Sequence, residues 1–423
     1  MRNVIGLVGA VVLLGACSAS VGGNPDGGGN PDGGGNPDGG GNPDGQTGNA
    51  ACSTGTLFAG NPTYDGDPSD RPTSGTGILA DPPLQWQTMV FAGTHLYTRQ
   101  ESEVWSVDLS ASSPVEKRIA GVTPSGSTYD FSMGACASAS TTQLRGLAAL
   151  PDGSLVASDY WANAIVKITN PDSPSCTVSS IAGNAGPFTG IDPSDDTTYP
   201  PSGTADGQGS AASFTELGAM IADASGTIYV ADRTVSQGPS TVRKIDSSGK
   251  VTTLLTLSEK DGTPDAIHNF TIMNGKLYAA AGDASNQSYV FQIDTTSGAM
   301  TMIHSGDSDA WDPVPSGEDP TVSGITNDGT SLIVAGDGYV WYLGLDGSLK
   351  LVAGTGFDID NFPSGYDAHA SHAALDLALP AAIGSADENG TGSLYHVAYK
   401  DGAVYFRGHA DGTAAFIEKI ACP

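Results

Sequence analysis

The stretch at 203–255 constrains the fold of this chain most. Apolar runs of about five residues alternate there with polar ones, and Asp-Gly or Ser-Gly pairs separate them. This alternation is typical of short antiparallel strands joined by tight turns. The pattern predicts four consecutive strands, at 217–222, 227–231, 241–246 and 250–255.

Three segments of this stretch carry a family resemblance. YVAD lies at 229–232, RKI at 243–245 and VTTL at 251–254, after a Gly-rich lead-in. This arrangement resembles the NHL repeat, in which one repeat forms one blade of a β-propeller. The segment 146–183 resembles it too, because Asp159, Asn163 and Lys167 match the family's D-x-x-N-x-x-I-x-K-I. One blade cannot bury both of its faces alone, so the resemblance implies further blades.

The same kinds of strand recur along the chain. Second strands are predicted at 95–100, 154–159, 227–232, 276–282, 331–336 and 393–398; third strands at 103–108, 164–169, 241–246, 289–294, 339–344 and 403–408; fourth strands at 115–121, 177–183, 250–256, 299–305, 348–354 and 414–421. First strands are less distinct, as at 145–150, 216–222 and 380–386. We therefore expect an all-β fold over 52–423, an NHL-like six-bladed β-propeller of four-stranded antiparallel blades.

One predicted strand has no blade of its own. TLFAG at 56–60 ends like a fourth strand, although no blade precedes it. Propellers commonly close by adding an N-terminal strand to the last blade, which removes an open sheet edge. The segment 414–421 is already assigned to the fourth place of that blade, so the order of these two segments stays open.

The N-terminus predicts export. Residues 1–16 combine Arg2 with an apolar run at 4–14 that is too short to span a bilayer, which is typical of a signal peptide. The ending Leu14-Gly15-Ala16-Cys17 resembles the lipobox of bacterial lipoproteins. That resemblance implies cleavage before Cys17, acylation of Cys17 and anchoring in a lipid bilayer. Ser18 in place of Asp favours the outer membrane of a Gram-negative cell.

Residues 17–51 are expected to form a disordered tether. Most of this segment repeats GGNPDG and contains almost no apolar residue that could form a core. A Gly-rich chain of roughly thirty residues separates its ends by about 30 Å.

The number of cysteines, five, is consistent with an exported lipoprotein. With Cys17 assigned to lipid, four remain in an exported protein, where disulfides persist. Cys52 opens the propeller and Cys422 ends it, and the ends of a ring must meet, so the ring-shaped fold implies Cys52–Cys422. Cys136 and Cys176 lie before and within one repeat, which leaves them as the second pair.

The charge excludes one class of partner. Acidic residues outnumber basic ones 46 to 17, which gives a net charge of −29. Such a chain repels nucleic acid. The acidity suits divalent cations, cationic ligands or simply the surface of an exported protein.

Candidate ligand-contacting residues lie in the turns. We select Asp159, Trp161, Asp232, Arg233 and Trp311. The repeat predicts a structural role for Asp159 and Asp232, as hydrogen-bond acceptors in the turn after the second strand. Trp161 and Trp311 lie in loops beside aspartates, where an indole suits a sugar or a peptide.

Signatures of catalysis are mostly missing. The chain contains no G-x-S-x-G, Walker loop or H-E-x-x-H, and the glycines at 207–212 precede strands rather than a helix. His369 and His372 are expected in a short packed helix, and His268 and His396 in strands. No catalytic, cofactor or metal residue is assigned, although the acidic links at 192–196, 307–312 and 358–360 leave calcium open.

The residues favour a non-catalytic scaffold, a cell-envelope lipoprotein that binds a protein or glycan partner on one face of the propeller. Other six-bladed propellers are calcium-dependent lactonases or a zinc-dependent lyase. The alternative is therefore a calcium-dependent hydrolase or lyase with its site at the mouth of the central tunnel.

Overall fold

The structure is a computed structural model, and its described residues belong to the unit Asn49–Pro423. They are residues 52, 54–60, 88–111, 116–122, 126–233, 238–258, 263–283, 285, 287–306, 308–311, 322–336, 339–354, 372–373, 397–410 and 414–422. The predicted signal peptide, Cys17 and the tether lie outside them. Within these ranges, no helix has the length and apolar character that crossing a membrane requires.

Six antiparallel blades make up the fold. Blade I contains β2 (Thr88–Ala92), β3 (His95–Gln100), β4 (Glu103–Asp108) and β5 (Glu116–Ala120). Blade II contains β8 (Leu144–Ala149), β9 (Leu155–Asp159), β10 (Ala164–Thr169) and β11 (Thr177–Gly183). Blade III contains β14 (Glu216–Ala222), β15 (Ile228–Arg233), β16 (Ser240–Ile245) and β17 (Lys250–Thr256).

The second half of the ring repeats this order. Blade IV contains β18 (Ala266–Met273), β19 (Lys276–Gly282), β20 (Ser288–Ile293) and β21 (Met300–Gly306). Blade V contains β22 (Val322–Asn327), β23 (Leu332–Gly336), β24 (Tyr339–Leu343) and β25 (Leu349–Ala353). Blade VI contains β27 (Val397–Lys400), β28 (Ala403–Ala410), β29 (Ala414–Ala421) and β1 (Thr54–Gly60).

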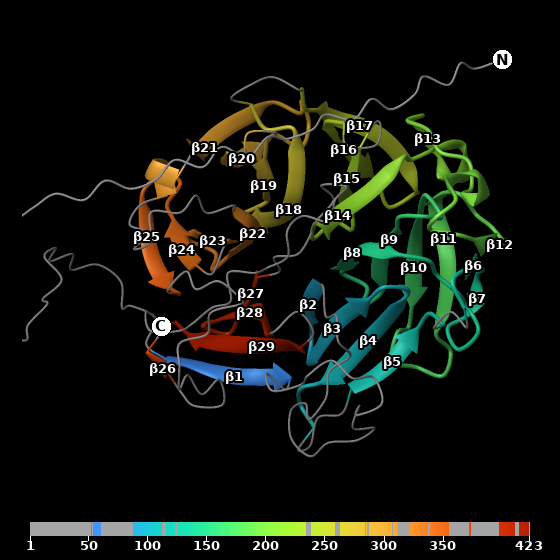
Figure 1. The fold of residues 1–423 in the computed structure, drawn as a ribbon, viewed down its shortest axis with the longest axis horizontal. Coiled ribbons are helices and arrows are strands. Elements are labelled where there is room, and N and C mark those ends of the chain that lie inside the picture. Colours follow the sequence, from blue (N-terminus) through green and yellow to red (C-terminus); the bar gives the residue numbers. More distant parts are fainter. Residues whose placement is uncertain are drawn as a thin grey trace, which may run out of the picture. The chain divides into compact units, whose positions relative to one another are not determined.

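The first strands close the ring. In cyclic order, β2, β8, β14, β18, β22 and β27 each contact the next, and β27 contacts β2 again. Figure 1 shows these six strands nearest to the common centre of the sheets. The expected six-bladed propeller of four-stranded antiparallel blades is therefore confirmed.

Burial falls from the centre outward. Every residue of the second strands β9, β15 and β23 is buried, whereas the fourth strands β17 and β21 are largely exposed or half-buried. The apolar core lies between neighbouring blades. Ile228, Val230 and Ile245 of blade III, for example, pack against Val156 and Ile165 of blade II. Each blade therefore needs its neighbours in order to bury both of its faces.

A β-bulge recurs in all six fourth strands. Opposite the third strand, one apolar residue of the fourth strand is skipped in the pairing: Ile119, Ile181, Leu254, Ile303, Val352 and Phe58. A bulge bends and twists the strand that carries it. The apolar runs IA, LL and LVA near the ends of the fourth strands provide four of these six residues, and Ile303 and Phe58 lie in MIHS and LFAG.

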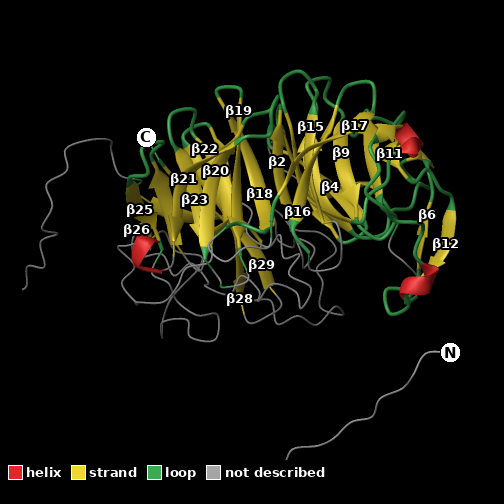
Figure 2. Cartoon of the chain, turned by 90° about the horizontal axis from the view of Figure 1, so that it is seen from above, coloured by secondary structure: helices red, strands yellow, loops and turns green. Residues whose placement is uncertain are grey.

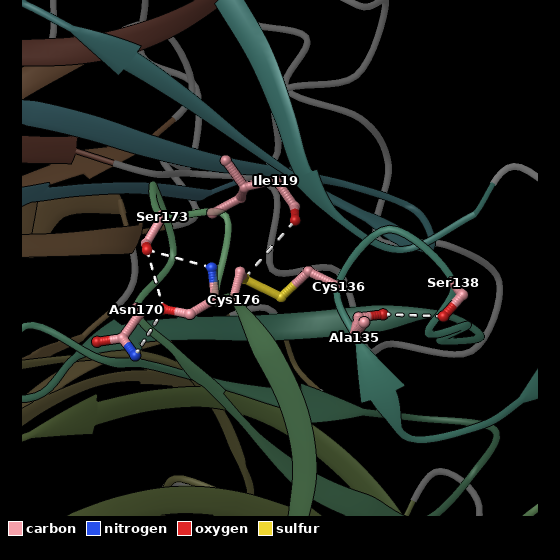
Figure 3. Close-up of a disulfide and its surroundings, with 8 residues drawn as sticks. Ile119, Ala135, Cys136, Ser138, Asn170, Ser173 and Cys176 are labelled. Atoms are coloured by element: carbon pink, nitrogen blue, oxygen red, sulfur yellow. Dashed lines mark hydrogen bonds between the residues drawn. A yellow bond between two sulfur atoms is a disulfide. The ribbon is translucent and has the colours of Figure 1, made fainter.

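The bulge carbonyls support the neighbouring blades. A Cβ at Gly249 or Gly347 would lie 3.0 Å from the carbonyl oxygen of Ile181 or Ile303 in the preceding blade, and both glycines have positive φ. Cys176 stands at the same place in blade II, where its Sγ lies 3.9 Å from the carbonyl oxygen of Ile119 (Figure 3). In blades II to V, the turn before the fourth strand therefore rests on the preceding blade, and Gly298 in blade IV lies in the same way against the carbonyl of Leu254.

Blade VI corrects the predicted strand order. We expected 393–398, 403–408 and 414–421 as its second, third and fourth strands. Instead β27 is first, β28 second and β29 third, and β1 pairs with β29 as the fourth. Because β1 occupies the fourth place, the C-terminal strands move one place inward. The predicted first strand at 380–386 lies outside the described residues.

Both disulfides form between the expected partners, Cys52–Cys422 and Cys136–Cys176. Cys422 directly follows the third strand of blade VI and Cys52 precedes the fourth, with a Cα–Cα distance of 4.1 Å. The bridge therefore replaces the turn that joins third and fourth strands in the other blades. Cys136–Cys176 fastens the short outer strand β7 (Gly134–Ala135) to β11 (Figure 3).

Several short elements extend the outer edges. β13 (Gly207–Gln208) pairs with β17 and is followed by the 3₁₀ helix η3 (Gly209–Ala211), so these glycines form no dinucleotide-binding loop. β26 (His372–Ala373) pairs with β1, so the short helix predicted around His372 is wrong at that residue, while His369 and His396 lie outside the described residues. β6 (Tyr129–Phe131) and β12 (Phe188–Ile191) form a separate two-stranded sheet beside blade II.

Candidate functional site

In the part of the chain that the structure describes, the fourth strands end and the first strands of the next blades begin at one face, which we call the link face. First strands begin and second strands end there, so this face carries the turns from second to third strands and the links from each fourth strand to the next blade. Figure 2 shows the opposite face, where tight turns join first to second strands, along the upper side. Variable loops on a rigid ring are a common place for binding sites.

Asp159 fixes the link face of blade II from inside. Its side chain is fully buried and accepts hydrogen bonds from the backbone N–H of Thr142 at 2.8 Å and of Ala162 at 3.1 Å. The hydroxyl of Thr142 also donates to it. Burial raises the pKa of the Asp159 carboxyl to about 6, although these hydrogen bonds oppose the rise. Asp159 thus has the structural role that the repeat predicts, and it positions the turn at 160–163.

Trp161 lies in that turn, within a cluster of aromatic side chains. Its ring packs edge-on against Tyr129, with the centroids 4.7 Å apart, and lies 6.5 Å from the ring of Tyr199 at 40°. All three side chains are half-buried and pack against the core of blade II. They come from three segments: the β6 strand, the turn at 160–163 and the residue after the 3₁₀ helix η2 (Asp196–Thr198). We call Tyr129, Trp161 and Tyr199 the aromatic cluster.

A buried guanidinium lies next to this cluster. Arg145 is 6% exposed and lies in the bulge of first strand β8. Its Cζ stands 4.2 Å from the ring centroid of Tyr160, and its Nη2 and Nε donate to the amide oxygen of Gln143 at 3.1 and 3.3 Å. Arg145 is therefore a positioned residue of this face, which the sequence alone did not identify.

Carboxylates surround the aromatic cluster. Burial raises the pKa of Tyr199, and the charges of Asp196 and Asp192 raise it further, whereas Arg145 acts in the opposite direction. Burial likewise raises the pKa of Tyr129, with a contribution from Glu101. The tyrosine hydroxyls are therefore neutral at physiological pH, and the local charge at the cluster is predominantly negative.

Asp232 and Arg233 have different roles in blade III. Asp232 is buried and accepts from the backbone N–H of Thr215 at 2.9 Å and from Nη1 of Arg243 at 2.9 Å. Burial raises the pKa of Asp232, and Arg243 opposes this, so the charged pair persists at neutral pH. Arg233 is 9% exposed at the end of β15, beside Glu216 across the strand pair. We had selected both residues as candidate ligand contacts, which would require exposed side chains, but both side chains are buried. Asp232 instead has the structural role that the repeat predicts.

Trp311 is not a binding platform, which corrects the prediction. Its side chain is fully buried at the end of the 3₁₀ helix η4 (Ser308–Trp311). It packs edge-on against His304, with centroids 4.5 Å apart, and against Trp341 at 5.8 Å. Because η4 turns the indole toward blades IV and V, Trp311 belongs to their core.

Two further polar residues, Glu216 and His268, lie on the first strands, which are the strands nearest to the centre of the ring. Glu216 begins first strand β14, and His268 occupies the bulge of the neighbouring first strand β18. Glu216 is 8% exposed and its Oε2 has no hydrogen-bond partner. Burial lowers the pKa of His268 to about 4, with a further contribution from Arg233, so its imidazole is neutral at pH 7. Both residues were unassigned because the first strands have the least distinct sequence pattern.

In the acidic link at 192–196, the aspartate side chains accept hydrogen bonds from neighbouring residues of the chain. Asp192 accepts from the N–H of Ser194 at 2.9 Å, and Asp195 from the N–H of Thr197 at 3.1 Å. The hydroxyl of Ser194 and then its backbone N–H, both of which donate to Asp192, hold the pKa of that carboxyl below its usual range. Across the described ranges, no group of three or more His, Cys, Asp or Glu side chains is placed to hold a metal ion. The acidic link at 358–360 lies outside those ranges.

A family model described as a repeat of unknown function (DUF6923) matches residues 191–312, which span blades III and IV. The curated proteins provide no match.

Among solved structures, the chain is similar to a luciferin-regenerating enzyme, at 10% identity over 79% of this chain and 91% of that one, with a TM-score of 0.46. It is also similar to the PQQ-bound aldose sugar dehydrogenase from Streptomyces coelicolor, at 13% identity over 88% and 100% of the two chains, with a TM-score of 0.44. The virginiamycin B lyase from Staphylococcus aureus gives 13% identity over 80% and 96%, with a TM-score of 0.42. No activity passes to this chain from similarities of this size.

Proposed function

We propose that this chain is a cell-envelope lipoprotein that binds a protein or glycan partner on the link face of an NHL-type propeller, without catalysis. Acylated Cys17 anchors it in the outer membrane, and the segment at 17–51 is the tether. One observation carries the binding role: the half-buried aromatic cluster on blade II, assembled from a turn and two long links. Aromatic faces with polar edges are well suited to sugars and peptides.

The binding test compares two truncations of apolar side chains in the full chain, purified in detergent with its disulfides intact. Trp161→Ala removes the centre of the aromatic cluster. Leu345→Ala is the matched control, because Leu345 is a large apolar side chain that is 46% exposed and lies in the turn between β24 and β25. On a glycan and peptide array, we expect the wild type and Leu345→Ala to retain the same partners and Trp161→Ala to lose them. Equal retention by both variants would exclude the aromatic cluster as the binding site.

Anchoring has a separate test. Cys17→Ser should abolish labelling of the protein by radioactive palmitate and release it from the membrane fraction. The Cys136→Ser/Cys176→Ser variant, which keeps Cys17, should still be labelled. Labelling of Cys17→Ser at the wild-type level would overturn the lipoprotein assignment.

A second candidate is a calcium-dependent hydrolase or lyase at the tunnel mouth. The observations in its favour are Glu216, a buried carboxylate with an unpartnered oxygen at the start of β14, and the neutral His268 in the bulge of the neighbouring first strand β18. Such a pair suits general acid–base chemistry. Metal analysis and melting with calcium provide the test, since saturation at 100 times the dissociation constant adds about 2.7 kcal/mol. Bound metal, together with lactone or ester hydrolysis that Glu216→Gln abolishes, would favour this candidate over the scaffold.

A further inference from the structure

Two rings of the aromatic cluster form a wedge. Trp161 and Tyr199 lie 6.5 Å apart between centroids with planes inclined at 40°, whereas Tyr129 contacts Trp161 edge-on at 4.7 Å. Tyr129 therefore supports the indole, and Trp161 and Tyr199 are each only half-buried, so part of both rings is accessible. Because the centroids are 6.5 Å apart, one group can lie within about 6 Å of both, which is the distance at which a cation is attracted to aromatic faces.

The wedge is held in place by its surroundings. The hydroxyl of Tyr199 donates to the carbonyl oxygen of Pro193 at 3.1 Å, so the ring is fixed to the acidic link at 192–196. Asp159 holds the turn that carries Trp161 through the N–H of Ala162. Rigid rings lose little conformational freedom on binding, which favours recognition by a preformed site.

The charges on the wedge favour a positive ligand. Asp192, Asp196 and Glu101 act on the two tyrosines, and Arg145 is the one cation among the described residues that acts on Tyr199. The guanidinium of Arg145 already stacks on Tyr160 and bonds to Gln143. Two carboxylates act on the wedge itself against one engaged guanidinium, and Glu101 adds a third beside the supporting Tyr129. On a chain of net charge −29, these charges attract cations and repel anions.

We propose that the wedge of Trp161 and Tyr199 binds a small organic cation of the quaternary ammonium class, with Asp196 supplying a nearby countercharge. This inference rests on the proposed function, because it names the chemistry that the same aromatic cluster recognises. A quaternary ammonium group needs no hydrogen-bond acceptor. It gains from ring faces and from a nearby but not contacting carboxylate.

The test separates charge from shape. Choline and tetramethylammonium are titrated into the full chain by calorimetry and by tryptophan fluorescence, alongside 3,3-dimethylbutan-1-ol, the neutral isostere of choline. We expect both cations to bind and the neutral isostere to bind at least about tenfold more weakly. Asp196→Asn should weaken choline binding about two- to fivefold and reduce its salt dependence. Asp401→Asn, an exposed carboxylate in the turn between β27 and β28 on the opposite face, should leave choline binding unchanged.

The outcomes distinguish this inference from the proposed function. Equal binding of choline and its neutral isostere would overturn cation recognition, as would equal effects of Asp196→Asn and Asp401→Asn. If no cation binds but Trp161→Ala still abolishes array binding, the aromatic cluster binds its partner by other chemistry and only this inference fails. If array binding survives Trp161→Ala while choline binding is lost, the proposed function fails at this site and the cation site stands.

Discussion

Removing the bridge Cys52–Cys422 should destabilise the propeller more than removing Cys136–Cys176. The first bridge joins residues 370 apart in sequence and the second joins residues 40 apart. In the loop-entropy model, closing these loops stabilises the native state by about 6 and about 4 kcal/mol respectively. The model therefore predicts a difference of about 2 kcal/mol between the Cys52→Ala/Cys422→Ala and Cys136→Ala/Cys176→Ala variants.

The two pairs are well matched for this comparison. Cys52 and Cys176 are each 7% exposed, and Cys422 and Cys136 are each 4% exposed, so truncation to alanine removes similar buried area in both variants. Urea unfolding at pH 7 gives each free energy from the midpoint and the m-value. Losing the ring-closing bridge should also lower the m-value, because β1 can then separate from β29 before the other blades unfold. A Cys136→Ala/Cys176→Ala variant that is equally or more destabilised would refute the reasoning.

Three further predictions concern buried groups. The pKa of Asp159 is about 6 in the folded state and near 4 when unfolded, so its contribution to stability falls as the pH rises through that window. Acidification from pH 7 to pH 5 should therefore stabilise the protein by about 1 kcal/mol through Asp159. Asp159→Asn should remove this part of the gain and keep the part that comes from the raised pKa of Asp232. Arg243→Met leaves Asp232 buried without its cation, and should cost about 3–5 kcal/mol in urea unfolding. Gly298→Ala should cost more than about 2 kcal/mol, because φ is +73° and its Cβ would meet the carbonyl oxygen of Leu254.

Each of these has a control within the chain. Asp246 is exposed and its pKa is lowered by bonds from Ser248, so Asp246→Asn should keep the gain in stability between pH 7 and pH 5. Lys167→Met breaks an exposed ion pair with Asp152 and should cost about 1 kcal/mol or less. Gly93 has φ +59° with no atom within 4 Å of an added Cβ, so Gly93→Ala should cost only about 1 kcal/mol. Equal costs for the two glycine variants would contradict the role assigned to the bulge carbonyl.

The sequence predicted the second and third strands well, because those strands are buried on both faces and their apolar residues form continuous runs. Leu155–Asp159 and Ile228–Arg233 are such strands, and every residue in them is buried. Blade VI was shifted by one strand because a sequence pattern marks a strand without stating its place in the sheet. That place depends on β1, which lies more than three hundred residues earlier in the chain.

The candidate site was harder to predict. Trp161 and Trp311 both lie beside aspartates in loops, yet one is half-buried on the link face and the other is fully buried. Local sequence does not distinguish them, because η4 decides which way the second indole points. Tyr129 and Tyr199 were not selected, since only the folding of two separate links brings them to Trp161.

The position of β1 in blade VI also determines when that blade can be completed during synthesis. β1 is the first of the described strands to be synthesised, and its neighbour within blade VI, β29, is the last of them, so this pairing can form only after β29 has been made. Until then Cys52 lacks its partner Cys422, and β1 can pair only with the two-residue strand β26. A chain that ends before Cys422 therefore keeps a free thiol at Cys52. A thiol-reactive probe directed at Cys52 would distinguish such a chain from one that has formed the Cys52–Cys422 bridge.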